Sequence, residues 1–235
     1  MIQNINTQRL RVPSVCILCN QYHREQHTIC AACITLFTPL GPACRHCAMP
    51  LPDDDDAICG ACCLKKPDVD RVITAYRFEE PLRTLLHAFK YRDGLYLTSL
   101  LTTLMLHAAI DTSTIQCLIP IPMHPKRLRE RGFNQAAILA MRLSRILKLP
   151  YDVNQCKKII NTTPQAGLSA VMRKKNLKNA FQSHTLPYQH VTLIDDLLTT
   201  GNTANEVART LKRQGVKEVD VWCCARAVPQ RLMYG

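Results

Sequence analysis

Cysteine is the most prominent chemically active residue in the first part of the chain. Of the 13 cysteines in 235 residues, nine fall between Cys16 and Cys63. Eight of them form four C-x-x-C pairs separated by 10, 10 and 11 residues: Cys16/Cys19, Cys30/Cys33, Cys44/Cys47 and Cys59/Cys62. Two thiolates spaced in this way can bind one ion from a tight turn, and two such turns complete a tetrahedral site of four sulfurs. The spacing therefore predicts two structural zinc ions, with Cys63 left over as a non-ligand.

The spacing leaves open which pairs share an ion. Joining neighbouring pairs closes shorter loops than interleaving them, but the difference in loop entropy is only about 0.5 kcal/mol. A thioredoxin-like redox role is the alternative for one C-x-x-C pair, and it leaves the other three unexplained. We expect a zinc-binding module over residues 1–66, with its ligands within 16–62, because so short a segment cannot bury a core of its own.

A second group of functional side chains lies between Val191 and Thr203. The segment contains an apolar strand (191–194), two adjacent carboxylates, Asp195 and Asp196, and then a Thr-Thr-Gly-Asn-Thr loop that opens a helix. Such a loop offers backbone N–H groups and hydroxyls at a positive helix end, which suits a phosphate. Neighbouring carboxylates can accept hydrogen bonds from the hydroxyls of a sugar. The alternative is that the acids only cap the turn, but their mutual repulsion argues against it.

Basic residues are concentrated after the proline-rich strand end at 120–122. Four cations fall within six positions there: Lys126, Arg127, Arg129 and Arg131. A leaving group with several negative charges, such as pyrophosphate, needs neutralisation of this kind, normally shared with Mg²⁺. His124 lies in the same segment and is a further candidate for contact with the anion. A solvated basic turn is the alternative interpretation.

A second basic cluster follows the segment Thr-Thr-Pro-Gln-Ala-Gly at 162–167. It consists of Arg173, Lys174, Lys175 and Lys178. Proline and glycine before a basic helix suit a hood that closes over a bound anion and excludes water. A contact with nucleic acid is the alternative.

The composition and the charge limit the class of protein. Hydrophobic residues make up 47% of the chain, enough to build a core, so disorder is excluded for the chain as a whole. The net charge of +12 favours phosphate-bearing or other acidic partners. This charge belongs to residues 67–235, which carry 24 basic and 13 acidic side chains, whereas residues 1–66 carry 6 and 5.

No stretch of the sequence predicts a membrane helix. The most apolar segment, 95–110, is interrupted by hydroxyl-bearing residues and a histidine, and it is shorter than the roughly 20 apolar residues that a span requires. Residues 1–13 lack the apolar core of a signal peptide. We therefore expect a cytoplasmic protein without membrane insertion, in a reducing compartment where paired cysteines bind metal more often than they form disulfides.

Apolar periodicity begins after residue 66 and predicts an α/β domain over 67–235. The predicted strands are 72–78, 117–121, 158–160, 191–194 and 219–223, and the predicted helices begin near 82, 95, 134 and 203. Strands that alternate with helices of this length are typical of a parallel sheet flanked by helices.

The run from Val191 to Thr203 resembles the ribose-5-phosphate-binding signature of type I phosphoribosyltransferases: four hydrophobic residues, two acids, two hydrophobic residues, Thr-Thr-Gly and a final Thr. The resemblance implies a type I phosphoribosyltransferase-like fold, in which Asp195 and Asp196 hold the ribose hydroxyls of phosphoribosyl pyrophosphate. It also implies that the loop wraps the 5-phosphate through Thr199, Thr200, Gly201, Asn202 and Thr203. Asn202 departs from the small residue usual at its position, although its backbone N–H can still donate.

Two further segments extend the resemblance over nearly the whole chain. The run Arg131-Gly-Phe-Asn-Gln, with His124, Lys126 and Arg127 before it, looks like the pyrophosphate-loop region of ComF/GntX-type proteins. Gln165 and the segment 173–181 are similar to the mobile hood of the same family. A head of C-x-x-C pairs joined to such a domain is the architecture of this family, which is associated with natural competence and the use of imported DNA.

The resemblance implies displacement at the anomeric carbon of ribose, with Mg²⁺ and the basic segment stabilising the departing pyrophosphate. We expect turnover to depend on Asp195, Asp196, Arg131 and Arg173, with positioning and electrostatics supplying most of the rate. Enzymes of this fold that act on 6-oxopurines carry an acidic base where this chain has Thr199. The resemblance therefore gives no support for a hypoxanthine- or guanine-type acceptor, and it does not identify the acceptor.

A non-catalytic binding protein is the rival class. Such a protein would sense phosphoribosyl pyrophosphate, or bind single-stranded DNA as an adaptor beside a DNA-translocating competence protein. Grooves that bind single strands usually add stacking aromatic residues. Aromatic residues make up only 6% of this chain, and its single tryptophan, Trp222, falls in the last predicted strand. The composition therefore favours binding of a small ligand over a dedicated DNA-binding role.

Overall fold

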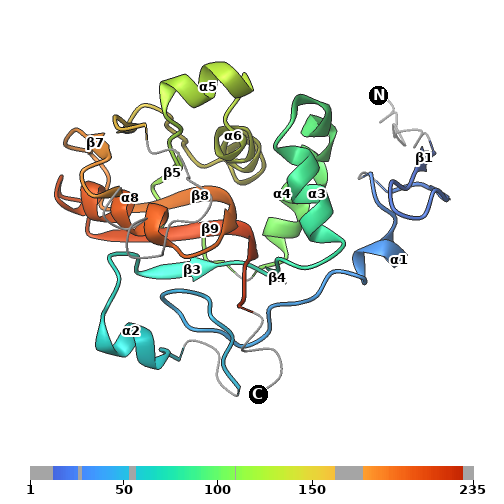
Figure 1. Ribbon diagram of the computed structural model, residues 1–235, viewed down its shortest axis with the longest axis horizontal. Helices are drawn as coiled ribbons and strands as arrows, with labels where there is room; N and C mark the ends of the chain where they lie inside the picture. The colour runs from blue at the N-terminus through green and yellow to red at the C-terminus, as the bar shows by residue number, and fades with distance from the viewer. Residues whose placement is uncertain (1–12, 26–27, 53–56, 109, 162–176, 230–235) are drawn as a thin grey trace, which may run out of the picture.

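A parallel sheet forms the centre of the protein (Figure 1). The computed structural model describes residues 13–25, 28–52, 57–108, 110–161 and 177–229. The sheet consists of β3 (Arg71–Ile73), β4 (Tyr76–Arg77), β5 (Cys117–Pro120), β8 (His190–Leu198) and β9 (Glu218–Arg226). Its order is β3-β9-β8-β5, β4 also pairs with β9, and every pairing is parallel. The predicted α/β class is confirmed.

The strands are apolar on both faces because helices cover both. On one face, α3 (Leu82–Phe89), α4 (Thr98–Leu106) and α6 (Gln135–Leu147) pack against side chains that include Leu118, Ile194 and Trp222. On the other face, α8 (Asn202–Lys212) packs against side chains that include Leu193 and Val221. The 3₁₀ helix η1 (Arg92–Leu97) leads directly into α4. The result is three layers, as buried parallel strands require.

The cysteine-rich head lies partly beside α3, where α1 (Ala31–Ile34) is found, and partly along the outer edge of the sheet, beside β3 (Figure 1). It contains the short elements β1 (Ser14–Val15), β2 (Tyr22–His23), α1 and α2 (Gly60–Leu64). Between α1 and α2 the chain donates from Leu40 N to Ala75 O at 2.8 Å, and Val72 N donates to Arg45 O at 2.8 Å. These hydrogen bonds satisfy backbone groups that an edge strand would otherwise expose. The head is therefore continuous with the sheet in its hydrogen bonding.

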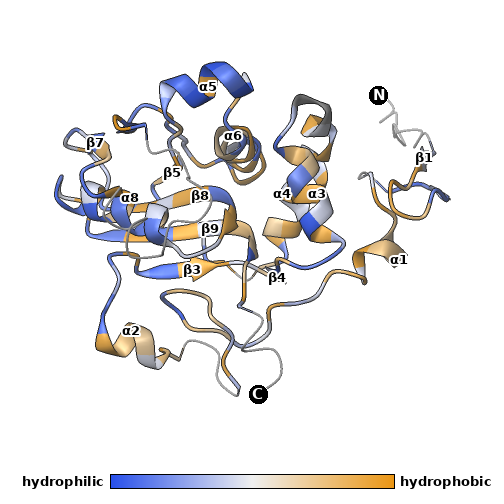
Figure 2. Cartoon of the chain, in the orientation of Figure 1, coloured by the Kyte–Doolittle hydropathy of each residue, from blue (hydrophilic) through white to orange (hydrophobic). Residues whose placement is uncertain are grey.

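Three local features differ from the expectations. The basic segment is a helix, α5 (Pro125–Arg131), with His124 as its N-cap, Pro125 in its first turn and Gly132 left-handed at its end (φ 83°). Figure 2 shows this helix as hydrophilic, and none of its residues is buried. β8 continues four residues beyond its predicted end. β6 (Cys156–Lys158) pairs with β7 (Phe181–Ser183), a strand that no pattern predicted. None of the described helices combines the length and the apolar character that crossing a membrane demands.

Gly94 offers a test of the packing between η1 and α3. A Cβ at this position would lie 2.1 Å from Ala88 O and 2.7 Å from Phe89 Cα, both backbone atoms that cannot turn aside. Gly94→Ala is therefore expected to lower the free energy of unfolding by about 3 kcal/mol, measured by chemical denaturation. Gly60→Ala is the control, because a Cβ at Gly60 meets nothing within 4 Å. Equal stability of the two variants would contradict the packing described here.

Candidate functional site

The sheet opens at the point where β5 ends and β8 continues. Pro120, the last residue of β5, pairs with Ile194, so β8 from Asp195 onward pairs only with β9. α6 follows β5 on one face of the sheet, and α8 follows β8 on the other. In open α/β sheets, the crevice at such a switch point is the usual place for a ligand. The predicted carboxylates lie at this point.

A cleft of about 180 Å³ occupies the opening. It brings together the two acids of β8 and the cations of the helix after β5, which are about 70 residues apart in the sequence. The polar residues that line it are Asp195, Asp196, His124, Arg127, Arg131, Asn134, Gln135, Lys158 and Thr203. A site with two carboxylates facing several cations suits a ligand that carries both hydroxyls and anionic groups.

The two carboxylates are held close together. Asp196 N donates to Asp195 Oδ1 at 2.9 Å. Burial raises the pKa of Asp195 well above its usual value, the adjacent Asp196 raises it further, and the charge of Lys90 opposes these two effects. A cation or a ligand that compensates the charge of the pair would therefore favour the ionised form of Asp195.

α5 directs its cations in two directions. Arg127 and Arg131, one turn apart, line the cleft, whereas Lys126 and Arg129 are exposed outside it. His124 lines the cleft too, and its Nδ1 accepts from Lys126 N at 3.2 Å as the helix N-cap. Of the predicted anion-contacting residues, His124, Arg127 and Arg131 therefore reach the cleft and Lys126 does not.

Two lining residues were not singled out from the sequence. Lys158, on β6, faces the cleft, and burial together with the charge of Arg127 lowers its pKa. Gln135 begins α6 and accepts at Oε1 from Arg131 at 3.0 Å, which fixes the guanidinium. Gln135 could have been found, because it ends the Arg-Gly-Phe-Asn-Gln run. Lys158 lies on a separate strand, and no motif marks it.

The loop after β8, which the sequence predicts to be a phosphate-binding turn, enters α8 through a left-handed glycine. Gly201 has a φ of 72° and is the N-cap residue of α8, so it has no side chain to cap the helix, and the first helical N–H, that of Asn202, donates to Thr200 Oγ1 at 3.5 Å. The positive φ, rather than lack of space, favours glycine, since a Cβ would meet only Leu198 Cδ1 at 3.9 Å. Thr203 lines the cleft. Thr199 is exposed and lines neither the cleft nor the larger cavity described next.

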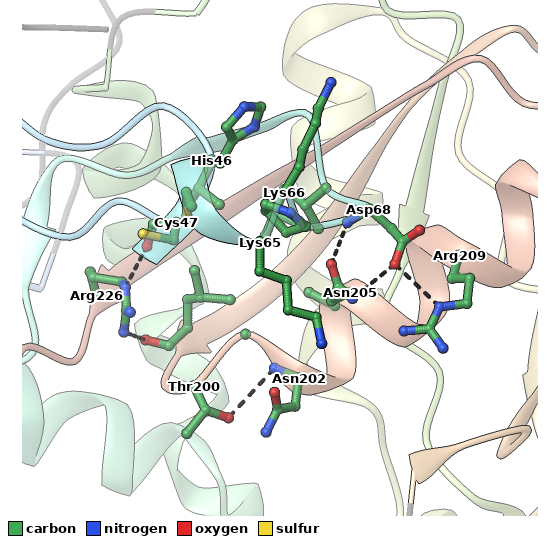
Figure 3. Close-up of a pocket in the computed structure, with 18 of the residues that line it drawn as sticks. His46, Cys47, Lys65, Lys66, Asp68, Thr200, Asn202, Asn205, Arg209 and Arg226 are labelled. Atoms are coloured by element: carbon green, nitrogen blue, oxygen red, sulfur yellow. Dashed lines mark hydrogen bonds and ion pairs between the residues drawn. The ribbon is translucent and has the colours of Figure 1, made fainter. Parts of the chain in front are cut away.

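A larger cavity of about 470 Å³ lies between the loop and the cysteine-rich head (Figure 3). From the loop it is lined by Thr200, Gly201 and Asn202, and from the head by residues that include His46, Cys47, Cys62, Lys65 and Lys66. The phosphate-binding turn thus contributes to two cavities.

The eight paired cysteines form two tetrads of neighbouring pairs: Cys16, Cys19, Cys30 and Cys33, and Cys44, Cys47, Cys59 and Cys62. Within each tetrad all sulfur atoms lie within 4.8 Å of one another. Cys19 Sγ is 3.8 Å from Cys30 Sγ, and Cys47 Sγ is 3.7 Å from Cys59 Sγ. Tetrahedral coordination with zinc–sulfur bonds of about 2.3 Å requires sulfur atoms about 3.8 Å apart. The tetrads fit zinc, and the pairing that the sequence left open is the sequential one.

In each tetrad the surroundings favour the thiolate of the first cysteine, whereas burial and the neighbouring cysteines raise the pKa of Cys33 and Cys62. Burial raises the pKa of Cys16 and Cys44, but hydrogen bonds from backbone N–H groups, led by those of Cys30 and Cys59 respectively, outweigh it. The pKa values of these thiols fall to about 6 for Cys16 and about 7 for Cys44. Cys63 is exposed and belongs to neither tetrad, as expected.

Some predicted site residues lie outside the described part of the chain. Arg173, expected to be catalytic, is one of them, as are Gln165 and most of the predicted hood. Lys178, from the same basic cluster, lies within the described residues and lines the larger cavity.

The sequence matches two families of domains and several proteins. Residues 134–232 match the phosphoribosyl transferase domain, and residues 8–63 match the double zinc ribbon domain. The chain is 34% identical to competence protein F of Haemophilus influenzae, over 90% of this chain and 96% of the relative. It is 34% identical to the DNA utilization protein YhgH of Escherichia coli K12, over 93% and 100%. It is 24% identical to competence protein ComFC of Bacillus subtilis, over 86% and 90%.

The tetrads predict the metal content of the protein. We expect two zinc ions per chain by mass spectrometry of the purified protein, one for each tetrad. Cys16→Ser and Cys44→Ser should each reduce the content to about one ion, because a tetrahedral site loses a ligand. Cys63→Ser should leave it unchanged. Loss of zinc from the Cys63 variant would contradict the assignment of ligands.

The raised pKa of Asp195 predicts an unusual dependence of stability on pH. The native state holds a proton that the unfolded state has released, so ionisation in the native state costs stability as pH rises through the raised pKa. Without added ligand, Asp195→Asn should stabilise the protein relative to wild type, and by more at about pH 8 than at about pH 4, since the loss begins above the unfolded pKa of about 3.9. Thermal unfolding at both pH values measures this difference.

Asp111→Asn is the control for that experiment. The exposed carboxylate of Asp111 has its pKa lowered by hydrogen bonds from the Ser113 N–H and hydroxyl, so its replacement should give no gain that grows with pH. A stabilisation by Asp195→Asn that is the same at both pH values would argue against a buried, repelled carboxylate.

Proposed function

The chain belongs to the family of competence protein F, ComFC and the DNA utilization protein YhgH, and on this basis we propose that it binds phosphoribosyl pyrophosphate together with Mg²⁺. The ligand would be held by a phosphoribosyltransferase-like domain over residues 67–235, with the zinc-binding module over 1–66. The proposal extends to transfer of the phosphoribosyl group and to a role in the use of imported DNA.

The composition of the 180 Å³ cleft carries the proposal. Phosphoribosyl pyrophosphate presents two ribose hydroxyls between a pyrophosphate and a 5-phosphate. Asp195 and Asp196 offer acceptors for the hydroxyls, and Arg127, Arg131 and Lys158 offer positive charge for the pyrophosphate. The N–H groups that open α8 supply the place for the 5-phosphate.

The donor set of the cleft also fits Mg²⁺. This ion prefers oxygen ligands and is commonly bound through one or two carboxylates together with phosphate oxygens of the substrate. Asp195 and Asp196 are the carboxylates available in the cleft. When bound, Mg²⁺ would neutralise part of the charge that develops on the pyrophosphate.

In the proposed transfer, the bond between the anomeric carbon and the pyrophosphate oxygen breaks, and the acceptor takes the place of the pyrophosphate. Arg127 and Arg131 would stabilise the negative charge on the leaving group, and Gln135 holds Arg131 in position through its 3.0 Å hydrogen bond. Asp195 and Asp196 would keep the ribose in place for attack. The acceptor is not assigned. Arg173, which the sequence predicts to close over the anion, lies outside the described residues.

The alternative is a protein that binds phosphoribosyl pyrophosphate without turnover and acts as a sensor. A second non-catalytic option is a cytoplasmic adaptor that binds single-stranded DNA beside a DNA-translocating competence protein. Turnover with an acceptor separates these alternatives from the transferase.

Calorimetry tests the binding. Wild-type protein loaded with zinc is expected to bind phosphoribosyl pyrophosphate in the micromolar range only when Mg²⁺ is present. The double variant Asp195→Asn/Asp196→Asn should lose binding. Arg127→Gln should weaken binding roughly tenfold or more, because a hydrogen bond to a charged group contributes about 1.5–3 kcal/mol.

Arg145→Gln is the matched control, since it removes the same charge from an exposed position in the last turn of α6, outside the cleft. If Arg145→Gln weakened binding as much as Arg127→Gln, only the overall positive charge would matter. If the folded wild-type protein bound no phosphoribosyl pyrophosphate, the proposed function would be wrong.

A further inference from the structure

Arg226, the last residue of β9, joins the second cysteine tetrad to the phosphate-binding turn (Figure 3). Only 4% of its surface is exposed. Its Nε donates to Cys47 O at 2.7 Å. One terminal nitrogen of the same guanidinium donates to Leu198 O at 3.2 Å and also to Thr199 O. A single buried side chain thus bonds a metal-binding knuckle on one side and the start of the loop on the other.

The hydrogen bonds lie where they fix the loop. Leu198 is the last residue of β8 and pairs in register with Arg226, and Ala227 N donates to Leu198 O at 2.9 Å. Thr199 is the first residue of the loop. The guanidinium therefore determines where the chain leaves the sheet and, with it, how the N–H groups of 200–203 are presented.

The charge of Arg226 is also explained by the tetrad. Within the described residues, no carboxylate forms an ion pair with Arg226, although a buried charge normally requires a partner. Four thiolates around one Zn²⁺ carry a net charge of about −2, which is the countercharge that this guanidinium otherwise lacks.

The first tetrad has no such connection. Cys16 and Cys33 pack in the hydrophobic core on the α3 and α4 face of the sheet. No cysteine of the first tetrad lines either cavity, whereas Cys47 and Cys62 of the second tetrad line the cavity at the loop. The two metal sites, similar in sequence, therefore differ in their relation to the loop.

We propose that Arg226 is a positioning residue that couples metal binding at the second tetrad to anion binding at the loop 199–203. The proposal rests on the proposed function in one respect, because it takes the 5-phosphate as the anion of the loop. Coupling is reciprocal: zinc at the second tetrad strengthens binding of the anion, and the anion slows loss of that zinc.

Equivalent serine substitutions in the two tetrads test the proposal. Cys30 and Cys59 are the third ligands of their tetrads, each directly precedes a short helix, and each N–H donates to the sulfur of the first ligand. Cys59→Ser should weaken binding of ribose 5-phosphate at least fivefold more than Cys30→Ser, since couplings between sites are commonly 5- to 150-fold. Calorimetry measures both, with zinc content confirming the loss of one ion and Cys63→Ser as the unaltered control.

Hydrogen exchange provides a readout that needs no ligand. The amides of 199–205 should exchange faster in Cys59→Ser than in wild type, and Cys30→Ser should change them less. If the wild-type protein binds no ribose 5-phosphate but Cys59→Ser still loosens the loop, the proposed function fails and the coupling stands. If the wild-type protein binds and the two serine variants are equivalent in both readouts, the coupling is wrong.

Substitution of Arg226 identifies the side chain responsible. Arg226→Lys keeps the charge but cannot bond both sides at once, and Arg226→Met removes charge and donors at similar size. Both variants should bind ribose 5-phosphate more weakly than wild type. Both should also release zinc from the second tetrad to a chelator faster, and added ribose 5-phosphate should no longer slow that release. Should Arg226→Met fail to fold, Arg226→Lys carries the test. If ribose 5-phosphate slowed zinc release from a folded Arg226→Lys protein as much as from wild type, the proposed role of Arg226 would be wrong.

Discussion

β5 ends opposite Ile194, while β8 continues to Leu198 against β9 alone. This difference in length leaves one side of β8 without a neighbour over the residues that bear the carboxylates. If β5 were longer, the ladder would close over Asp195, and the helix after β5 would begin too far away to face it. The cleft, its acids and the α5 cations all depend on where β5 stops pairing.

The interior of the cleft is electrostatically unfavourable when it holds only protein. Asp195 is pushed toward its neutral form by burial and by Asp196, while Lys158 is pushed toward its neutral form by burial and by Arg127. Each of these groups would be better satisfied by a ligand with the opposite charge. Such concentrated strain between like charges is typical of functional sites, where folding stability is given up for binding.

The sequence predicted those features that depend on local spacing. The C-x-x-C pairs identified all eight cysteines of the tetrads, and the run from 191 to 203 identified the strand, the acids and the turn. α5 was read as a loop, although Pro125 and Gly132 are the flanking residues that a helix prefers. Lys158 and Arg226 reach their places through the pairing of distant strands, so a single sequence without the fold could not assign them.

β9 occupies the middle of the sheet although it is the last strand along the chain. It lies between β3 and β8, whose sequences are separated by more than 100 residues, and it pairs with both. β3 and β8 do not pair with each other, and β9 joins them. During synthesis, therefore, these two strands cannot be joined in one sheet until residues 218–226 have left the ribosome. The sheet cannot be completed before residues 218–226 are available, and a chain cut short before residue 218 would lose the centre of the sheet instead of an edge. The zinc-binding head precedes this strand in the sequence, so it can take up its metal before the sheet is complete.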